Sequence, residues 1–408
     1  MARGASRDVP VTNNMLMTNA GVCDGLETCL EWLGRLVAFD TTSRNSNLAL
    51  IEMVETYVQS LGIASHRVPN AEGTKANLYF SVGEMVPGGV ILSGHTDVVP
   101  VDGQDWHSDP WTIRLADGKV YGRGTADMKS FLALALEALP RMQAAGLKRP
   151  VHFALSYDEE IGLLGAPAMI RELAGRLPLP CAVIVGEPTE MQVVERHKGI
   201  LGLRTAVTGH EAHSSQTHLG ISANMVAVRL MAKIDALAQA LAGADTGEDE
   251  GLTPAHTTMT IGLVEGGSAP NILAGRCQFY WDIRPAPGEN PHALLDAFNA
   301  FAHQEETAMQ SRFPSCSITT EILSDVPGLH SEPMGAAGEL AARLTGANAR
   351  HAASYVAEAG QFQQAGFSTV ICGPGSIAQA HQPNEFITLE QLRQGKRFMT
   401  RLIEELAL

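Results

Sequence analysis

The sequence predicts an α/β fold in two domains. The larger has a mixed, mostly parallel sheet flanked by helices, and a smaller ferredoxin-like α+β domain is inserted into it. In the first half of the chain, short apolar runs alternate with helical segments, which is typical of a parallel α/β layer. From about Gly199 the expected elements follow the order β-α-β-β-α-β of a ferredoxin-like sheet. The length of 408 residues also exceeds the roughly 150 residues of an average domain.

The larger domain begins with two helices. Apolar residues between Leu26 and Leu61 recur at helical spacing and are interrupted by a turn-like run that starts at Asp40. Further along, apolar runs predict strands, and the periodic segments between them predict helices. The strands are expected over residues 76–81, 89–93, 150–156 and 181–186, and the helices over residues 128–143 and 165–177.

The inserted domain is expected over residues 199–324, so that residues 1–198 and 325–408 form the larger domain. Its strands are expected over residues 201–209, 257–264, 272–283 and 317–323, and its helices over residues 222–241 and 291–303. Residues 242–254, rich in Gly, Asp and Glu, predict an exposed loop. The larger domain is completed by a helix over 332–344, a strand over 368–372 and a helix over 388–406.

Composition excludes several classes of function. The chain carries 29 Lys and Arg against 44 Asp and Glu, a formal charge of −15 that repels nucleic acid and anionic membranes. Its 6 cysteines form no C-x-x-C pair, so neither a thiolate zinc site nor a disulfide framework is indicated. Residues 1–25 contain no continuous apolar segment and are expected to be a loose lead-in rather than a signal peptide. No later run approaches the roughly 20 apolar residues of a membrane helix, so we expect a soluble, cytoplasmic protein.

A histidine and an aspartate follow directly on one apolar run. The segment VILSGHTD places His95 at the carboxyl end of a strand, the edge where open α/β sheets place their sites. Asp97 points to the same side and can accept the second imidazole N–H, which would fix the tautomer for metal binding. Alternatively, the segment is a turn in which Asp97 caps the next element.

Further acidic and imidazole side chains lie at comparable strand or helix ends: Asp127, Glu159, Glu160, Glu187 and His381. Taken singly, they would be a helix N-cap, a solvated turn pair, a loop carboxylate and a surface histidine. Together with His95 they make a mixed nitrogen and oxygen set. Such a set suits borderline divalent metals such as zinc, and cobalt or manganese as well.

Five motifs in a fixed order, SGHTDVVP, GRGTADMK, DEEIGLLGA, GEPT and AHQPNE, resemble the M20 family of dinuclear zinc peptidases and deacylases. The resemblance extends over nearly the whole chain after the lead-in. It implies that the inserted domain is the family's lid and dimerisation domain, so we expect a homodimer formed through it. The sequence departs from the family at Ser130, where members often have Gly, and this bears only on local helix packing.

The resemblance implies two metal ions per subunit that share one bridging carboxylate, about 3.5–4 Å apart. The ligands divide into His95, Asp127 and Glu187 for the first ion, and His381, Asp127 and Glu160 for the second. The metal is expected to be Zn²⁺, with Co²⁺ or Mn²⁺ also accommodated. Glu159 then stays free as the general base that takes a proton from a metal-bound water, and Asp97 supports His95.

The resemblance also singles out residues beyond this cluster. His213, in the segment GHEAHSS, matches the family's histidine that reaches the partner subunit's site and stabilises the oxyanion; by itself it would be a loop histidine. Asn271 and Arg284, assigned to the two central strands of the inserted domain, match positions that hold a substrate α-carboxylate. Alternatively, Arg284 is a surface residue paired with Asp282. Glu358 is either a contact for a substrate ammonium group or a plain carboxylate at a helix start.

Within the family, a second set of motifs resembles the members that deacylate N-acylated amino acids: GEPTEMQVVERHKG, VEGGSAPNIL, DIRPAPGE, EAGQFQQAG and GPGSIAQAHQPNEF. The expected activity is therefore metal-dependent amide hydrolysis of a small acylated amino acid, without a covalent enzyme intermediate. A succinyl-diaminopimelate desuccinylase, an aminoacylase or a dipeptidase keeps this chemistry with another substrate. A noncatalytic metal-binding interaction protein is the alternative from a different class. It would require the loss of a ligand or of the base, and each of those positions is filled here.

Overall fold

The computed structural model describes residues 25–243 and 251–408, and the chain forms two compact units. The first unit comprises residues 1–195, 332–350 and 357–408, and the second comprises residues 196–331 and 351–356. The sequence places the second domain at 199–324, a shorter range than the second unit. The expected lead-in up to residue 24, and residues 244–250 of the expected loop, lie outside the described part of the chain.

The first unit is built on a mixed sheet with the strand order β1-β2-β6-β3-β7-β14-β8. Its strands are β1 (Ser65–Pro69), β2 (Ala76–Val82), β3 (Val90–His95), β6 (Val151–Ser156), β7 (Ala182–Pro188), β8 (Val194–His197) and β14 (Thr369–Gly373). The neighbours β6, β3, β7 and β14 run parallel, and every residue of these strands is buried. Burial on both faces explains why they occur as continuous apolar runs in the sequence. The fold class predicted from the sequence is confirmed.

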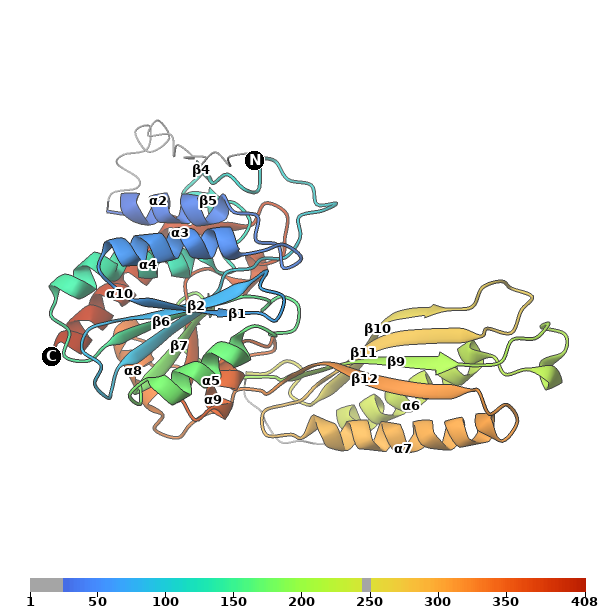
Figure 1. Ribbon diagram of the computed structural model, residues 1–408. Coiled ribbons are helices and arrows are strands. Elements are labelled where there is room, and N and C mark those ends of the chain that lie inside the picture. The colour runs from blue at the N-terminus through green and yellow to red at the C-terminus, as the bar shows by residue number, and fades with distance from the viewer. Residues whose placement is uncertain (1–24, 244–250) are drawn as a thin grey trace. The chain divides into compact units, whose positions relative to one another are not determined.

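Helices cover both faces of this sheet. In Figure 1, α2, α3 and α4 lie on one side of the sheet, and α5 and α9 lie on the other. The helices are α2 (Glu27–Val37), α3 (Leu48–Ser60), α4 (Lys129–Ala144), α5 (Ala166–Arg176), α8 (Ala336–Thr345), α9 (Ala359–Gln364) and α10 (Leu389–Ala407), with a short 3₁₀ helix η2 (Ile377–Gln379). Helix α4 is buried along most of its length, because it packs against the sheet and against α2 and α10.

The packing of α4 against the sheet requires a glycine at one position near the site. A Cβ atom added to Gly186 in β7 would lie 2.1 Å from the Phe131 ring of α4. Any side chain there would push the strand away from the helix. Gly186 directly precedes the candidate site residue Glu187.

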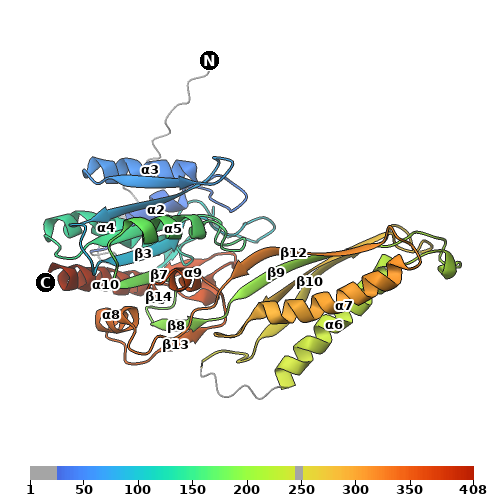
Figure 2. The same cartoon turned by 60° about the horizontal axis from the view of Figure 1, so that its bottom comes forward.

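The second unit is an antiparallel sheet of order β10-β11-β9-β12 with two long helices on one face (Figure 2). The elements are β9 (Ile200–Thr208), η1 (Thr217–Leu219), α6 (Ala223–Gly243), β10 (Thr258–Gly266), β11 (Arg276–Arg284), α7 (Pro291–Gln310), β12 (Ser317–Val326) and β13 (His351–Ala353). Alternate residues of β9 and β11 are buried, as expected for a sheet with one covered face. Trp281 of β11 packs on Phe298 of α7 at 4.6 Å between ring centroids, and its indole N–H donates to the Thr205 hydroxyl.

Some short strands were not predicted. These are β1, β8, β13 and a small sheet of β4 (Arg114–Ala116), β5 (Lys119–Tyr121) and β15 (Phe386–Thr388). Three-residue strands are too short for an alternating pattern, and β1 is an exposed edge strand with one buried residue, so neither carries an apolar signal. Among the described residues, no helix has the length and apolar character needed to cross a membrane.

Candidate active site

The candidate ligands collect at one edge of the first unit's sheet. His95 ends β3, Glu187 is the penultimate residue of β7, and Glu160 follows the end of β6 by four residues. These three strands are parallel neighbours, so their carboxyl ends share an edge. Asp127 lies two residues before α4, and His381 lies on the segment between β14 and β15.

The Asp127 carboxylate is the centre of this group. The Nε2 atom of His95 lies 2.9 Å from one of its oxygens, and the Nε2 atom of His381 lies 3.4 Å from the other. Nε2 of His381 also lies 3.0 Å from a Glu160 oxygen, and Nε2 of His95 lies 3.8 Å from a Glu187 oxygen. The structure thus brings together all five residues that the sequence analysis named as ligands. They form two histidine and carboxylate sets, one on each oxygen of Asp127.

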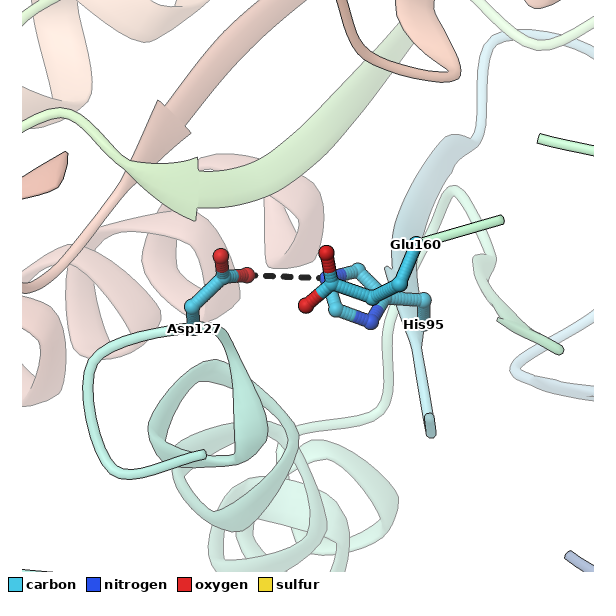
Figure 3. Close-up of side chains that lie close together, drawn as sticks. All are labelled: His95, Asp127 and Glu160. Atoms are coloured by element: carbon cyan, nitrogen blue, oxygen red, sulfur yellow. Dashed lines mark hydrogen bonds and ion pairs between the residues drawn. The ribbon is translucent and has the colours of Figure 1, made fainter. Parts of the chain in front are cut away.

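Figure 3 shows three of these side chains, with the Asp127 carboxylate and the His95 ring facing each other and Glu160 beside them. One ligand atom from each of His95, Asp127 and Glu160 lies within 4.8 Å of the other two. His95 and Asp127 are buried, whereas the side chain of His381 is 52% exposed. The carboxylates of the site are therefore buried, and the site meets solvent at His381.

The orientation of His95 is set by a backbone group rather than by the predicted carboxylate. Its Nδ1–H donates to the backbone carbonyl of Asp97 at 2.9 Å, whereas the nearest Asp97 carboxylate oxygen is 3.7 Å away. This bond leaves Nε2 facing the cluster, which is the arrangement a metal-binding imidazole needs. The backbone carbonyl thus takes the place that the sequence analysis gave to the side chain, because it is the acceptor within hydrogen-bond distance of Nδ1.

The Asp97 carboxylate has a different set of partners. It accepts the Ser43 hydroxyl at 2.7 Å and the backbone N–H groups of Glu159 and Glu160 at 3.2 and 3.3 Å. Both N–H groups belong to the turn that follows β6. Asp97 therefore holds the turn that carries Glu159 and Glu160.

The charges in the cluster perturb one another strongly. Burial acts to lower the pKa of His95, but the hydrogen bond to Asp127 and the nearby carboxylates raise it well above its usual value. Hydrogen bonds to Asp127 and Glu160 raise the pKa of His381 to about 10. Burial acts to raise the pKa of Asp127, yet its bonds to the two histidines lower it. Without a cation, protons on the two rings balance the carboxylates, and a divalent ion would take their place.

Glu187 and Glu159 are the two buried carboxyl groups of the cluster whose pKa is raised most clearly. Burial and the charge of Asp127 raise the pKa of Glu187 well above its usual value, and its buried Oε1 atom has no hydrogen-bond partner among the described residues. Burial and the charge of Glu187 likewise raise the pKa of Glu159, which is 9% exposed. An unpaired buried oxygen is costly, and a divalent cation with oxygen and nitrogen ligands satisfies it. The residues present thus fit a divalent metal centre.

Glu358 lies in the first unit, at the N-terminal end of α9. Its side chain is buried, and one oxygen accepts the Ser93 hydroxyl at 3.3 Å. The other oxygen has no hydrogen-bond partner in the described part of the chain, and burial raises the pKa of the group. A buried carboxylate with a free oxygen suits a cationic partner, although Glu358 is also the residue from which α9 starts.

His213 lies on an exposed loop of the second unit. The backbone N–H of Ser215 donates to its Nδ1 atom at 3.2 Å, and the Ser215 hydroxyl lies 2.8 Å from the same atom. Accepting an N–H at Nδ1 places the ring proton on Nε2 when the ring is neutral. That tautomer presents an N–H donor away from the loop.

Asn271 and Arg284 lie at opposite ends of β11. Asn271 is on the loop before the strand, so its assignment to a central strand is wrong: the strand starts at Arg276, because the segment after Pro270 turns to pair with the His213 loop. Arg284 is the last residue of β11, and its Nε–H donates to Asp282 at 3.3 Å. A strand of 9 residues spans about 26 Å. One chain therefore cannot place both side chains on the same carboxylate.

Sequence reasoning did not single out three residues that contact the ligand-bearing segments: Gln104, Arg123 and Glu385. The Glu385 carboxylate accepts the backbone N–H of Asp127 at 3.1 Å, and Gln104 donates to the backbone carbonyl of His381 at 3.0 Å. Two of them lie inside quoted motifs, GRGTADMK and AHQPNE. The available signal was a charged residue four positions from Asp127 and another four positions from His381.

A family model and a curated relative match most of the chain. The family model for Peptidase family M20/M25/M40 matches residues 91–405. An acetylornithine deacetylase of Proteus mirabilis (strain HI4320) is 33% identical over 373 residues, which cover 91% of this chain and 93% of the relative.

Solved structures share the fold. An M20 family metallo-carboxypeptidase from Sulfolobus solfataricus superposes with a TM-score of 0.74 at 17% identity, covering 93% of this chain and 99% of that one. A dinuclear metal-binding M20 family peptidase of Bacillus subtilis superposes with a TM-score of 0.60 at 15% identity, covering 93% and 97%. At these identities the superpositions establish the architecture.

Proposed function

The chain belongs to peptidase family M20/M25/M40, and we propose that it hydrolyses the amide bond of N2-acetyl-L-ornithine to give L-ornithine and acetate, a step of arginine biosynthesis. The observation that carries the hydrolase assignment is the convergence of His95 and His381 on the two oxygens of Asp127. The choice of substrate is supported by the 33% identity to an acetylornithine deacetylase across 91% of the chain.

The cluster supplies the chemistry of amide hydrolysis. The residues that would hold divalent cations are His95, Asp127, Glu160, Glu187 and His381. When bound, such cations would polarise the acetyl carbonyl and lower the pKa of the attacking water. Glu159, buried beside the cluster and not needed as a ligand, would take the proton from the attacking water. The same carboxyl group then returns the proton to the leaving α-amine. The ligand set suits Zn²⁺ and also accommodates Co²⁺ or Mn²⁺.

The second unit supplies groups for the substrate. Arg284 would bind the α-carboxylate through the face of its guanidinium not used by Asp282. His213, with its Nε2–H free, would donate to the oxyanion of the partner subunit's site. Asn271, on the neighbouring loop, would contact the substrate α-carboxylate in that same partner site. Because Asn271 and Arg284 lie at opposite ends of β11, this division assigns them to the sites of different subunits. Glu358 would meet the side-chain ammonium of the substrate.

A homodimer formed through the second unit is supported by its surface. Strand β10 is an edge strand, and its Leu263 and Val264 are each 49% exposed. Helix α6, which packs against β10, exposes Met225 and Val228 by 60% and 51%. An apolar edge strand beside an apolar helix face is a surface that a second copy of the chain can cover.

Mixing two inactive variants tests the action of His213 on the partner's site. We expect His213→Ala and Glu159→Gln to be inactive as pure dimers. Dissociated and reassociated together, they should recover about a quarter of wild-type turnover, because half of randomly formed dimers are mixed and each holds one intact site. If His213 served its own subunit, mixing would recover nothing. Each variant put through the same procedure with itself is the control.

A panel of acylated amino acids tests the substrate assignment. We expect kcat/KM for N2-acetyl-L-ornithine to exceed that for neutral N-acetyl amino acids and for dipeptides, because a neutral side chain offers no cation to the buried Glu358 carboxyl group. We expect it also to exceed kcat/KM for N-succinyl-diaminopimelate. A succinylated substrate or a dipeptide turned over equally well would make the chain a desuccinylase, an aminoacylase or a dipeptidase. A metal-loaded protein inactive on every substrate would support the noncatalytic alternative.

A cytoplasmic location is part of this proposal. The described cysteines Cys29, Cys181, Cys277, Cys316 and Cys372 are free thiols. Free thiols are typical of a reducing compartment.

A further inference from the structure

We propose that Glu385, Arg123 and Gln104 form a positioning network that holds Asp127 and His381 at the spacing the metal centre requires. The inference rests on the proposed metal-dependent function and adds residues outside the ligand set. The network connects two segments that are more than 250 residues apart, since Glu385 and Asp127 differ by 258 positions. One segment carries Asp127 and the other carries His381.

Glu385 is the centre of the network. Its carboxylate is 1% exposed and accepts three backbone N–H groups, those of Gly124, Ala126 and Asp127, at 2.9, 2.7 and 3.1 Å. The loop before α4 is therefore hydrogen-bonded to a single carboxylate through three of its backbone N–H groups. Glu385 lies four residues after His381 on the same segment, so this clamp joins the two ligand-bearing segments directly.

Arg123 balances the buried charge of Glu385. Its guanidinium is 1% exposed and donates to a Glu385 oxygen at 2.7 Å. The other end of the guanidinium donates to the side-chain oxygen of Gln104 at 2.6 Å. A buried ion pair has a fixed geometry, because either charge without its partner is costly.

Gln104 links Arg123 to the backbone of His381 through hydrogen bonds. Its Nε2–H donates to the His381 carbonyl at 3.0 Å, while its side-chain oxygen also accepts the Trp106 indole N–H at 3.0 Å. His381 has a φ of 63°, in the left-handed region that non-glycine residues rarely adopt. Such a conformation persists where the surroundings fix it. The hydrogen bond from Gln104 is a contact that does so.

The network touches only the backbone of the ligand residues and leaves their side chains free. The N–H of Asp127 and the carbonyl of His381 are held, whereas an Asp127 oxygen and Nε2 of His381 lie 3.4 Å apart and would be available to a metal ion. We therefore expect the network to act on metal affinity through ligand spacing. Loss of an outer partner of a metal ligand weakens metal affinity by about 10- to 100-fold.

The test is a titration of metal-free protein with Co²⁺, followed by visible absorption, for wild type, Glu385→Gln and Gln104→Ala. We expect both variants to bind Co²⁺ about 10- to 100-fold more weakly than wild type. Glu137→Gln is the matched control, since Glu137 is a largely buried carboxylate of α4 paired with Arg141 and Lys396. We expect it to keep wild-type affinity. Melting temperatures of the metal-free proteins show which variants are folded. If Glu385→Gln does not fold, the Co²⁺ affinity of Gln104→Ala tests the network by itself.

The outcomes separate this inference from the proposed function. Unchanged Co²⁺ affinity in folded Glu385→Gln and Gln104→Ala overturns the network, and so does an equal loss in Glu137→Gln. A wild-type protein that binds no Co²⁺ shows instead that the proposed metal-dependent function is wrong. Weaker binding confined to the two network variants supports the positioning role.

Discussion

Replacing Glu159 by glutamine is expected to lower kcat by about 10²- to 10⁴-fold, the contribution of a positioned general base. Glutamine keeps the shape of the side chain but cannot take a proton from water. Glu159 is buried beside the cluster, and its backbone N–H is held by Asp97, so the substitution should leave the fold and the ligands in place. We expect KM and metal content to stay near wild type.

The neighbouring substitution Glu160→Gln is the matched comparison. Both residues lie on the same turn, and each substitution removes one carboxylate, but only Glu160 contacts His381. Glu160→Gln should therefore lose metal affinity, whereas Glu159→Gln should lose turnover at full metal content. Undiminished activity in fully loaded Glu159→Gln would contradict the assignment of the base.

Asp127→Asn is expected to weaken metal binding more than any other substitution considered for this site. Both Asp127 oxygens face a histidine, and asparagine offers one oxygen and an NH₂ group that cannot bind a cation. Metal affinity and turnover should both fall by more than the roughly 10- to 100-fold caused by losing an outer partner. Removal of metal from the wild type with a chelator should abolish activity in the same way, and added Zn²⁺, Co²⁺ or Mn²⁺ should restore it.

The control for this substitution is Asp325→Asn in the second unit. Asp325 also pairs with a histidine, His292 at 3.0 Å, but both side chains are about half exposed. We expect its metal content, measured by elemental analysis, and its activity to match wild type. If Asp127→Asn kept two tightly bound ions per chain, Asp127 would not be the bridging ligand.

The convergence of the candidate ligands His95, Glu160 and Glu187 could be predicted because the sequence marks the ends of parallel strands. The runs before His95 and Glu187 are apolar throughout, since β3 and β7 are buried on both faces, and parallel strands end at a common edge. The second unit could be predicted for a similar reason. Its elements are long, and the order β10-β11-β9-β12 is the order expected of a ferredoxin-like sheet.

The contacts around the candidate ligands could not be predicted, because they depend on which atom of a residue makes the hydrogen bond. Asp97 orients His95 through its carbonyl and holds the Glu159 turn through its carboxylate, and sequence cannot tell these two uses apart. Glu385 binds backbone N–H groups, which every residue except proline carries, so no complementary side chain marked its target. The Asn271 loop was placed on a strand because Ile272 and Leu273 extend the apolar pattern of β11 toward it.

Anomalous diffraction at the zinc edge, from crystals of the zinc-loaded protein, tests the dinuclear centre most directly. We expect two peaks per chain about 3.5–4 Å apart, one on each side of Asp127. The first should contact His95 and Glu187, and the second should contact His381 and Glu160. A single peak, or two peaks without the Asp127 carboxylate between them, would contradict the account.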